Sequence, residues 1–251
     1  MRWRIERVGR IASTSDLVWQ RAAEGAEEGL EVLATEQTAG RGRHGRRWLS
    51  PAGNFHASWL LRPEVATAGA ASLSLVAGLA VRDALAGTRI PVDRLRLKWP
   101  NDILLGEAKL GGVLLEGRGE GAGGAIVVGV GINVAVAPEG AGRRTTSLRA
   151  LGDDVTTVER LLELLLDSFA RRYARWRKGG FAGQRAEWMG AAYRIGDMTS
   201  LRIGEGRLEG RFVDVDADGA LWLELAPGRR RRFMAGELVF ASETSNPTAG
   251  G

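Results

Sequence analysis

The chain has 251 residues, a formal net charge of +5 and no cysteine. This length allows one large domain or two smaller ones, and the missing thiols exclude disulfides, thiolate metal sites and a cysteine nucleophile. The sequence shows neither an apolar run long enough to cross a membrane nor the apolar block of a secretory signal at its start, so we expect a cytoplasmic protein without a membrane segment.

The first half of the chain is predicted to mix strands and helices. Thr14, Ser15 and Asp16 supply capping side chains for a helix that runs to about Gly25. An apolar, buried helix is expected over Ala70–Leu85. Strands are expected at Leu30–Glu36, Asn54–Leu61, Arg94–Trp99, Leu110–Glu116 and Gly124–Val136. The last of these is apolar at nearly every residue, which is typical of a strand covered on both faces.

The second half begins with the clearest helical pattern, Thr156–Lys178, where apolar residues recur along one stripe. Thr156 and Glu159 fit a capping box at its start, and Gly179-Gly180 end it. From about Tyr193 the pattern changes to short β-like runs separated by glycine-containing turns. We expect these runs to form a small antiparallel barrel of roughly 50 residues.

The stretch GRGRHGRRW, Gly40–Trp48, matches the glycine spacing of a dinucleotide-binding fingerprint. That fold needs a helix directly after the glycines, but Pro51 and a strand from Asn54 follow here, so we expect a loop between strands. Glycine backbone and forked arginine donors suit an anionic ligand, and closure of such a loop excludes water. A solvated basic turn is the alternative.

Three further segments carry residues suited to a ligand site: KWPNDIL (98–104), KLGGVLLE (109–116) and GVGIN (129–133). Each has an ordinary structural explanation by itself, since glycine in a strand is often a bulge. Taken in order with GRGRHGRRW, however, the set resembles the biotin protein ligase family over nearly the whole chain. Ser13-Thr14-Ser15 and Gln37 also fall where that family places biotin contacts, although the family often has asparagine where Ser15 stands.

The resemblance implies an α/β (α+β) fold, with a mixed-sheet ligase-type catalytic domain over residues 1–190 and an SH3-like barrel over 191–241. Residues 242–251 are polar and are expected to form a disordered tail. Many family members also bind DNA through an N-terminal winged helix-turn-helix. This sequence begins at the first catalytic segment, so we expect no DNA binding and leave monomer and weak homodimer as alternatives.

The resemblance also implies the reaction. Family members use ATP and Mg²⁺ to convert biotin to biotinyl-5′-AMP, and then transfer biotin to a lysine of a biotin carboxyl carrier domain of a carboxylase. Two anions meet in the first step, so the site must neutralise both. Arg41 and Arg43 are expected to bracket them, with Lys109 beside the carboxylate and α-phosphate. Asp102 either assists the acceptor lysine or helps to hold Mg²⁺.

The site residues that follow from the resemblance fall into three groups. Catalysis is expected from Arg41, Arg43, Asp102 and Lys109. Biotin contacts are expected from Ser13, Thr14, Ser15, Gln37, Arg41, Gly42, Arg43, Trp48, Lys109, Gly111 and Gly112. ATP and adenylate contacts are expected from Arg41, Arg43, Arg46, Asn101, Lys109 and Asn133. No metal ligand is assigned beyond the alternative for Asp102.

Two other functions are considered. Lipoate and octanoate ligases share the superfamily, but the GRGR and KWPND segments favour the biotin branch. A basic nucleic-acid-binding module predicts aromatic residues interleaved with arginines on one sheet face, which the barrel sequence lacks. The Arg229–Arg232 run is either a solvated strand edge or a contact to nucleotide or an acidic carrier, with Glu237 as its expected partner; His44 is expected to be solvated.

Overall fold

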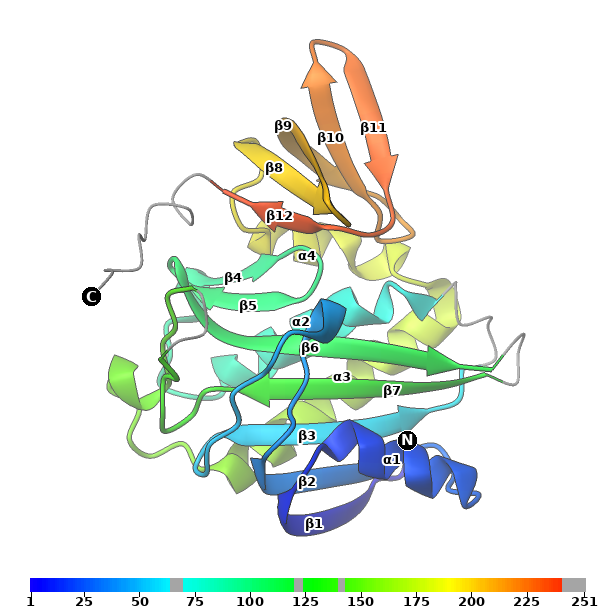
Figure 1. Ribbon diagram of the computed structural model, residues 1–251, viewed down its shortest axis with the longest axis vertical. Coiled ribbons are helices and arrows are strands. Elements are labelled where there is room, and N and C mark those ends of the chain that lie inside the picture. The colour runs from blue at the N-terminus through cyan, green and yellow to red at the C-terminus, as the bar shows by residue number, and fades with distance from the viewer. Residues whose placement is uncertain (64–69, 120–123, 140–142, 241–251) are drawn as a thin grey trace.

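The structure is a computed structural model that describes residues 1–63, 70–119, 124–139 and 143–240 (Figure 1). A seven-stranded sheet has the order β1-β2-β3-β7-β6-β5-β4, and a five-stranded sheet has the order β11-β10-β9-β8-β12. In the first sheet β1 pairs with β2 in parallel, whereas the other neighbours pair antiparallel. The sheet is therefore mixed, which confirms the predicted fold class.

The large sheet is built from β1 (Arg4–Ile11), β2 (Leu30–Gln37), β3 (Phe55–Leu61), β4 (Leu95–Lys98), β5 (Asp102–Leu105), β6 (Ala108–Arg118) and β7 (Ala125–Ile132). The helices are α1 (Thr14–Ala23), α2 (Leu73–Ala86), α3 (Val158–Gly179) and α4 (Arg185–Ala191). None of the helices in the described part of the chain is long and apolar enough to cross a membrane.

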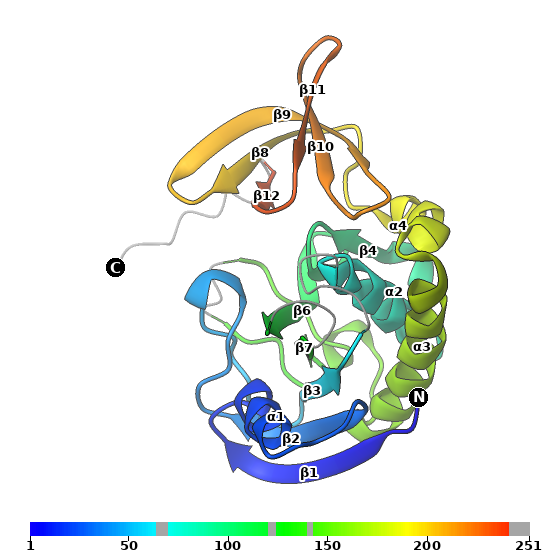
Figure 2. The same cartoon turned by 90° about the vertical axis from the view of Figure 1, so that its right-hand side faces the viewer.

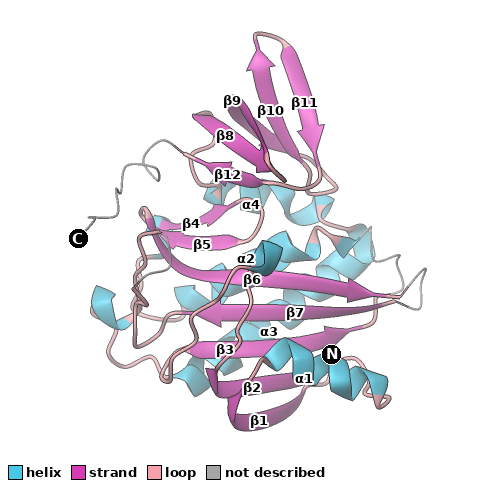
Figure 3. Cartoon of the chain, viewed as in Figure 1, coloured by secondary structure: helices cyan, strands magenta, loops and turns pink. Residues whose placement is uncertain are grey.

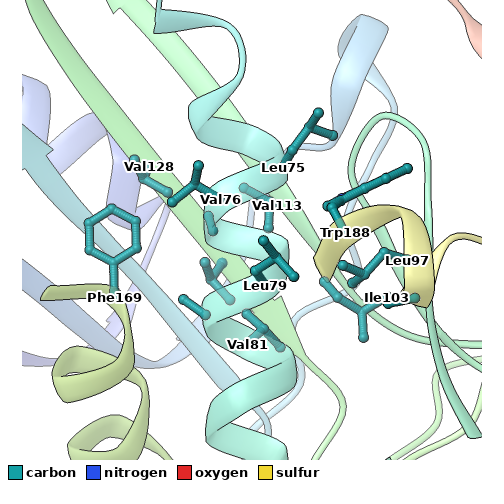
Figure 4. Close-up of a cluster of buried hydrophobic side chains, with 14 of the residues drawn as sticks. Leu75, Val76, Leu79, Val81, Leu97, Ile103, Val113, Val128, Phe169 and Trp188 are labelled. Atoms are coloured by element: carbon teal, nitrogen blue, oxygen red, sulfur yellow. The ribbon is translucent and has the colours of Figure 1, made fainter. Parts of the chain in front are cut away.

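Helices cover both faces of the large sheet (Figures 2 and 3). α1 lies against β2, β3 and β7 on one face, while α2 and α3 pack together on the other. Figure 4 shows the core under α2, where Val76 and Leu79 lie among Val113, Val128 and Phe169. β7, in the middle of the sheet, is thus covered on both sides, which explains why it is apolar along its length.

The start of α3 differs from the sequence expectation. Thr157, not Thr156, caps the helix, and its side chain accepts a hydrogen bond from the backbone N–H of Arg160 at 3.1 Å. The predicted capping box is wrong because Asp153 competes for Thr156, whose hydroxyl donates to that carboxylate at 2.6 Å. The carboxylate of Glu159 pairs with Arg7 at 2.9 Å instead of returning to the cap.

Other boundaries shift for identifiable reasons. β7 ends at Ile132 rather than Val136 because the side-chain oxygen of Asn54 accepts the N–H groups of residues 134–136, at 2.9 to 3.0 Å, and draws them out of the ladder. β1 was not predicted, since its charged residues lie half exposed on the sheet edge. β5 and α4 were also missed, because each is too short to show a period.

The second sheet contains β8 (Met198–Ile203), β9 (Gly206–Val215), β10 (Leu221–Ala226), β11 (Arg229–Phe233) and β12 (Glu237–Val239), all paired antiparallel. The β-like runs predicted from about Tyr193 are therefore confirmed as strands. Trp99 attaches this sheet to the large one, since its indole N–H donates to the Gly219 carbonyl at 3.0 Å. The predicted tail, 242–251, lies outside the described residues.

The arginine run on β11 does not pair with Glu237 as expected. Arg230 lies 3.5 Å from Glu224, and Arg232 pairs with Asp216 and Asp218 at 2.6 and 2.7 Å. β11 is an edge strand of the small sheet, on the side opposite to β12, and this separation explains the error. Glu237 has a different partner in the site described next.

Candidate active site

A cavity of about 450 Å³ opens beside the large sheet, with the start of α1, the loop after β2, the ends of β3 to β7 and strands β8 and β12 around it. Fourteen of the predicted site residues line it: Ser13, Thr14, Ser15, Gln37, Arg41, Gly42, Arg43, Arg46, Trp48, Asn101, Asp102, Lys109, Gly112 and Asn133. Gly111 is absent from the described lining. A methyl group on it would lie 2.7 Å from the Gly131 carbonyl oxygen, so its small size lets β6 approach β7.

One end of the cavity is neutral and rich in hydroxyl groups. The Thr14 hydroxyl lies 2.7 Å from the Ser58 hydroxyl and donates to the side-chain oxygen of Gln37 at 3.0 Å. The Ser15 hydroxyl lies 3.0 Å from Ser58 on its other side. Thr14, Ser15 and Ser58 are all buried. Because these groups hydrogen-bond to one another, they present donors and acceptors in fixed positions.

The arginine loop, residues 40–51, is ordered rather than loose. Arg41 and Arg47 form an antiparallel bridge, and the backbone N–H of Trp48 donates to the Gly40 carbonyl at 2.9 Å. At the tip, Arg43–Gly45 forms a single 3₁₀ turn in which His44 has φ 56°. No long helix follows the glycines; the chain continues to β3, so the dinucleotide-fold interpretation is correctly rejected.

Trp48 forms one wall of the cavity. A methyl group on Gly131 would lie 2.5 Å from its indole ring, so the ring packs flat against β7 only because that residue is glycine. The ammonium group of Lys109 lies 5.2 Å from the ring centroid. The indole N–H of Trp48 is buried and has no hydrogen-bond partner among the described residues. It is one of the few buried polar atoms of the described cavity wall without a partner.

The three predicted arginines make different contacts. Arg41 donates to both oxygens of Asp16 at 2.7 Å and lies 3.6 Å from Glu116, so it ties the start of the loop to α1 and β6. Arg43 donates to the Gly236 carbonyl at 2.9 Å, and burial lowers the pKa of its guanidinium. The side chain of Arg46 pairs with Glu237.

Glu237 was not predicted as a site residue, yet it connects the loop to the barrel. Its carboxylate oxygens accept from Arg46 at 2.6 and 2.5 Å, and this hydrogen-bonded pair lowers the pKa of Glu237. Glu237 begins β12, and Gly236 immediately before it receives Arg43. Two neighbouring barrel residues therefore hold two arginines of the loop.

The other end of the cavity is charged. Asp102 lies 2.5 Å from the ammonium of Lys109, and the guanidinium of Arg143 pairs with its second oxygen. Burial by itself raises the pKa of Asp102, but the nearby charges of Lys109, Arg143 and Lys98 outweigh burial and hold it well below its usual range. Asp102 is therefore ionised at neutral pH.

Two asparagines complete this region. Asn101 donates its side-chain N–H to the Val113 carbonyl at 2.7 Å, which fixes the turn between β4 and β5 against β6. Asn133 donates to the Thr146 carbonyl at 3.0 Å. Its side-chain oxygen is buried and accepts no hydrogen bond in the described part of the chain. Asn133 thus lines the cavity and carries a buried acceptor without a partner among the described residues.

Sequence reasoning missed several lining residues, namely Ser58, Lys98, Arg143, Arg202 and Glu237. Ser58 stands inside a recognised strand and had a signal, since it is a polar residue in a largely apolar run. Lys98 gave no such signal, because charged and apolar residues alternate along Arg94–Trp99. Arg143 and Glu237 reach the cavity only through tertiary contacts. The described residues contain no cluster of three or more metal-ligating side chains.

Comparisons with known proteins identify the family to which the chain belongs. Residues 8–133 match the model of the biotin/lipoate A/B protein ligase family, and residues 195–240 match that of the biotin protein ligase C-terminal domain. A biotin–[acetyl-CoA-carboxylase] ligase of Paracoccus denitrificans is 41% identical over 83% of this chain and 89% of its own. One of Mycobacterium tuberculosis is 35% identical over 94% and 89%. The Aquifex aeolicus biotin protein ligase in complex with biotin and ATP aligns with a TM-score of 0.78 at 29% identity, covering 93% of this chain and 97% of that one.

Proposed function

Since the chain belongs to the biotin/lipoate A/B protein ligase family, we propose that it is a biotin–[acetyl-CoA-carboxylase] ligase. In the first step the biotin carboxylate attacks the α-phosphorus of ATP, pyrophosphate leaves and biotinyl-5′-AMP forms. In the second step a lysine amine of the carrier attacks the acyl carbon and AMP leaves. One observation carries the proposal: a single cavity joins a neutral hydroxyl-lined end to a cationic end.

The neutral end fits the ureido ring of biotin. That ring is uncharged and offers both donors and an acceptor, so it matches hydroxyl and amide groups better than ions. Thr14, Ser15 and Gln37 keep their predicted biotin contacts in this proposal, with Ser58 added. Ser13 has a supporting role, because its side chain accepts from the Asp16 N–H at 3.4 Å and caps α1. Gly42 and Gly112 give the ligand access to backbone.

The charged end fits the two anions that must meet. Lys109 is assigned to the carboxylate and the α-phosphate, where its ammonium stabilises the charge that builds up at phosphorus. Arg43 supports it from the loop. Arg41 is committed to Asp16 and Glu116, so its contribution to catalysis is to hold the loop over the site. Trp48 then covers the bound biotin, next to Lys109.

The nucleotide is assigned to the region between the loop and β7. The unpaired side-chain oxygen of Asn133 suits the exocyclic amine of adenine, and the unpaired indole N–H of Trp48 suits a phosphate or carboxylate oxygen. Arg46 and Asn101 flank this region, and a triphosphate competes with Glu237 for Arg46. A buried polar atom without a hydrogen-bond partner costs free energy. ATP would supply partners for the Asn133 oxygen and the Trp48 indole N–H, and in this sense the side chains fit it.

Magnesium is proposed to arrive with the nucleotide. When bound, it supplies charge neutralisation at the phosphates. Both oxygens of Asp102 are engaged by Lys109 and Arg143, which disfavours Asp102 as a metal ligand. Its low pKa also makes it a weak base, so we assign Asp102 to orienting cations rather than to removing a proton from the acceptor lysine.

The remaining predictions complete the proposal. We place the domain division near residue 190, the acceptor on a biotin carboxyl carrier domain, and the reaction in the cytoplasm, where ATP is supplied. The match of residues 195–240 to a separate C-terminal domain model supports the division. A monomer or weak homodimer and the absence of DNA binding stay predictions.

The function is tested by the intact mass of a purified biotin carrier domain after incubation with this protein, ATP and MgCl₂, with biotin or lipoate offered in separate reactions. The proposal expects a biotin adduct on one lysine and its loss when ATP is omitted. A lipoyl adduct alone contradicts the biotin assignment and favours the lipoate branch of the family. Absence of both adducts with folded protein contradicts the ligase function.

A further inference from the structure

Arg143 lies at the charged end of the cavity, and neither the sequence motifs nor the reaction proposed above gives it a role. Its side chain is 19% exposed and pairs with Oδ2 of Asp102. Lys109 approaches the other oxygen, Oδ1, at 2.5 Å. Two cations from different segments therefore share one buried carboxylate, and each takes its own oxygen.

Main-chain hydrogen bonds place the two cations together. The Lys109 N–H donates to the Arg144 carbonyl, and the Thr146 N–H donates to the Lys109 carbonyl, both at 2.9 Å. Residues 143–146 thus run beside β6, where Thr145 forms an isolated parallel bridge with Lys109. Asn133 anchors this segment to the end of β7 through the Thr146 carbonyl. The backbone hydrogen bonds between Lys109 and residues 144 and 146 therefore also fix the main chain next to Arg143.

The charges explain why the arrangement matters. A lone Asp102–Lys109 pair is electrically neutral, and a carboxylate with two free oxygens can accept more than one N–H of an ammonium group. With Arg143 on Oδ2, Asp102 has one oxygen left for Lys109, and the three side chains together carry one positive charge. Lys98, which is buried nearby, adds to the field that keeps Asp102 ionised.

We propose that Arg143 is a positioning residue for adenylation, which rests on the ligase function proposed above. By holding Oδ2 of Asp102, it restricts that carboxylate to one hydrogen bond with Lys109. The remaining N–H donors of the Lys109 ammonium are then directed to the biotin carboxylate and the α-phosphate. Without Arg143, the freed Oδ2 of Asp102 accepts a second N–H of Lys109. The Lys109 ammonium is then drawn away from the biotin carboxylate and the α-phosphate.

The test measures formation of biotinyl-5′-AMP in a single turnover, by rapid quench, at saturating biotin and MgATP. Arg143→Met is expected to slow the rate on the order of tenfold to a hundredfold, because a hydrogen bond between charged groups is lost, and Arg143→Lys is expected to recover most of it. Arg144→Met is the matched control, since Arg144 is the exposed neighbour and does not line the cavity. It is expected to keep the wild-type rate.

A double-mutant cycle shows whether Arg143 acts through Asp102. If it does, Arg143→Met has little further effect in an Asp102→Asn background, so the two changes are strongly non-additive. Additive effects overturn the proposal and indicate a direct contact with ligand. A wild-type rate in Arg143→Met also overturns it. A merely structural role lowers the burst amplitude and the melting temperature but leaves the rate of the active fraction unchanged, and that result counts against the proposal as well.

Failure of the ligase function is distinguishable from failure of this inference. If the wild-type protein forms no biotinyl-5′-AMP in the same assay, the reaction assigned to the site is wrong. If the wild type forms the adenylate and Arg143→Met matches it, the reaction stands and the role of Arg143 is wrong. Thermal unfolding of every variant identifies any loss of fold, and Arg143→Lys keeps the test decisive if the methionine variant is unstable.

Discussion

The two ends of the cavity differ in charge. At one end the polar side chains are neutral and hydrogen-bond to one another, and at the other two cationic side chains pair with the same carboxylate. Thr14, Ser15, Ser58 and Gln37 form a chain of hydrogen bonds across α1, β2 and β3, and the Gln37 side chain also donates to Ser50. At the charged end, Asp102 and Lys109 contact the segment 143–146, and the Lys109 ammonium lies 5.2 Å from the Trp48 ring of the arginine loop. The neutral end is thus suited to select a ligand, and the charged end to stabilise a change in its charge.

The largest effect on the rate of adenylate formation is expected from removing the ammonium of Lys109 at the charged end. Lys109→Ala is expected to slow adenylate formation about a hundredfold or more, because a donor aimed at developing charge is lost. Biotin binding without ATP is expected to change far less, which calorimetry measures. Lys178→Ala, on the exposed end of α3, is the control. Equal losses of affinity and rate would remove the distinction between the two ends.

The neutral end is expected to respond in affinity rather than in rate. Thr14→Val keeps the side-chain shape but removes the hydroxyl that contacts Ser58 and Gln37. The KM for biotin is expected to rise about tenfold, since a buried hydrogen-bonding group loses its partner. Thr38→Val is the control, because Thr38 is exposed and close in sequence. A lowered kcat with unchanged KM would contradict this assignment.

A smaller effect is expected where the barrel meets the arginine loop. Glu237→Gln removes the charge that Arg46 contacts at 2.5 and 2.6 Å. The bound adenylate is expected to escape a few-fold faster, at about the strength of a half-exposed ion pair, as followed by release of labelled biotinyl-5′-AMP. Glu209→Gln, on an exposed part of the barrel, is expected to behave as wild type. Unchanged release would show that the loop stays closed without the barrel.

The smallest effect on activity is expected from Glu31, a buried carboxyl on β2 whose oxygens have no hydrogen-bond partner in the described part of the chain. Burial raises its pKa to about 8, the opposite of Asp102. The folded state therefore keeps a proton that the unfolded state releases above about pH 4.5, so stability falls as pH rises from there to about 8.

Glu31→Gln is expected to remove this pH dependence, which amounts to a few kcal/mol or less, while leaving adenylation unchanged. Urea unfolding at pH 5, 7 and 9 measures it, with the exposed Glu27→Gln as control. The same slope in Glu31→Gln as in the wild type would show that Glu31 is ionised in the folded state, and that burial alone does not decide the charge of a carboxyl in this sheet.

The same contrast explains what could be predicted from the sequence. Local patterns predicted the helix near Thr14 and the strand that ends near Gln37, although Ser13, and not the predicted Thr14 to Asp16, caps the helix. The biotin contacts expected from these residues came from the family resemblance. The GVGIN segment was singled out as a place for a ligand, but its contact with Trp48 was not predicted: Gly131 leaves room for the indole ring. Arg143 was not predicted either, because its position depends on hydrogen bonds to Lys109 across the sheet. Glu237 was paired with the wrong arginines for the same reason: charges along a strand do not reveal which distant segment faces them.

The division of the cavity into a neutral and a charged end is tested most directly by biotin-dependent exchange of labelled pyrophosphate into ATP. The wild type, Thr14→Val and Lys109→Ala are compared over a range of biotin concentrations. We predict that Thr14→Val reaches the wild-type exchange rate once biotin is saturating, whereas Lys109→Ala does not reach it at any biotin concentration. Recovery of Lys109→Ala by added biotin, or a persistent rate defect in Thr14→Val, would contradict the division of the cavity into a selecting end and a reacting end.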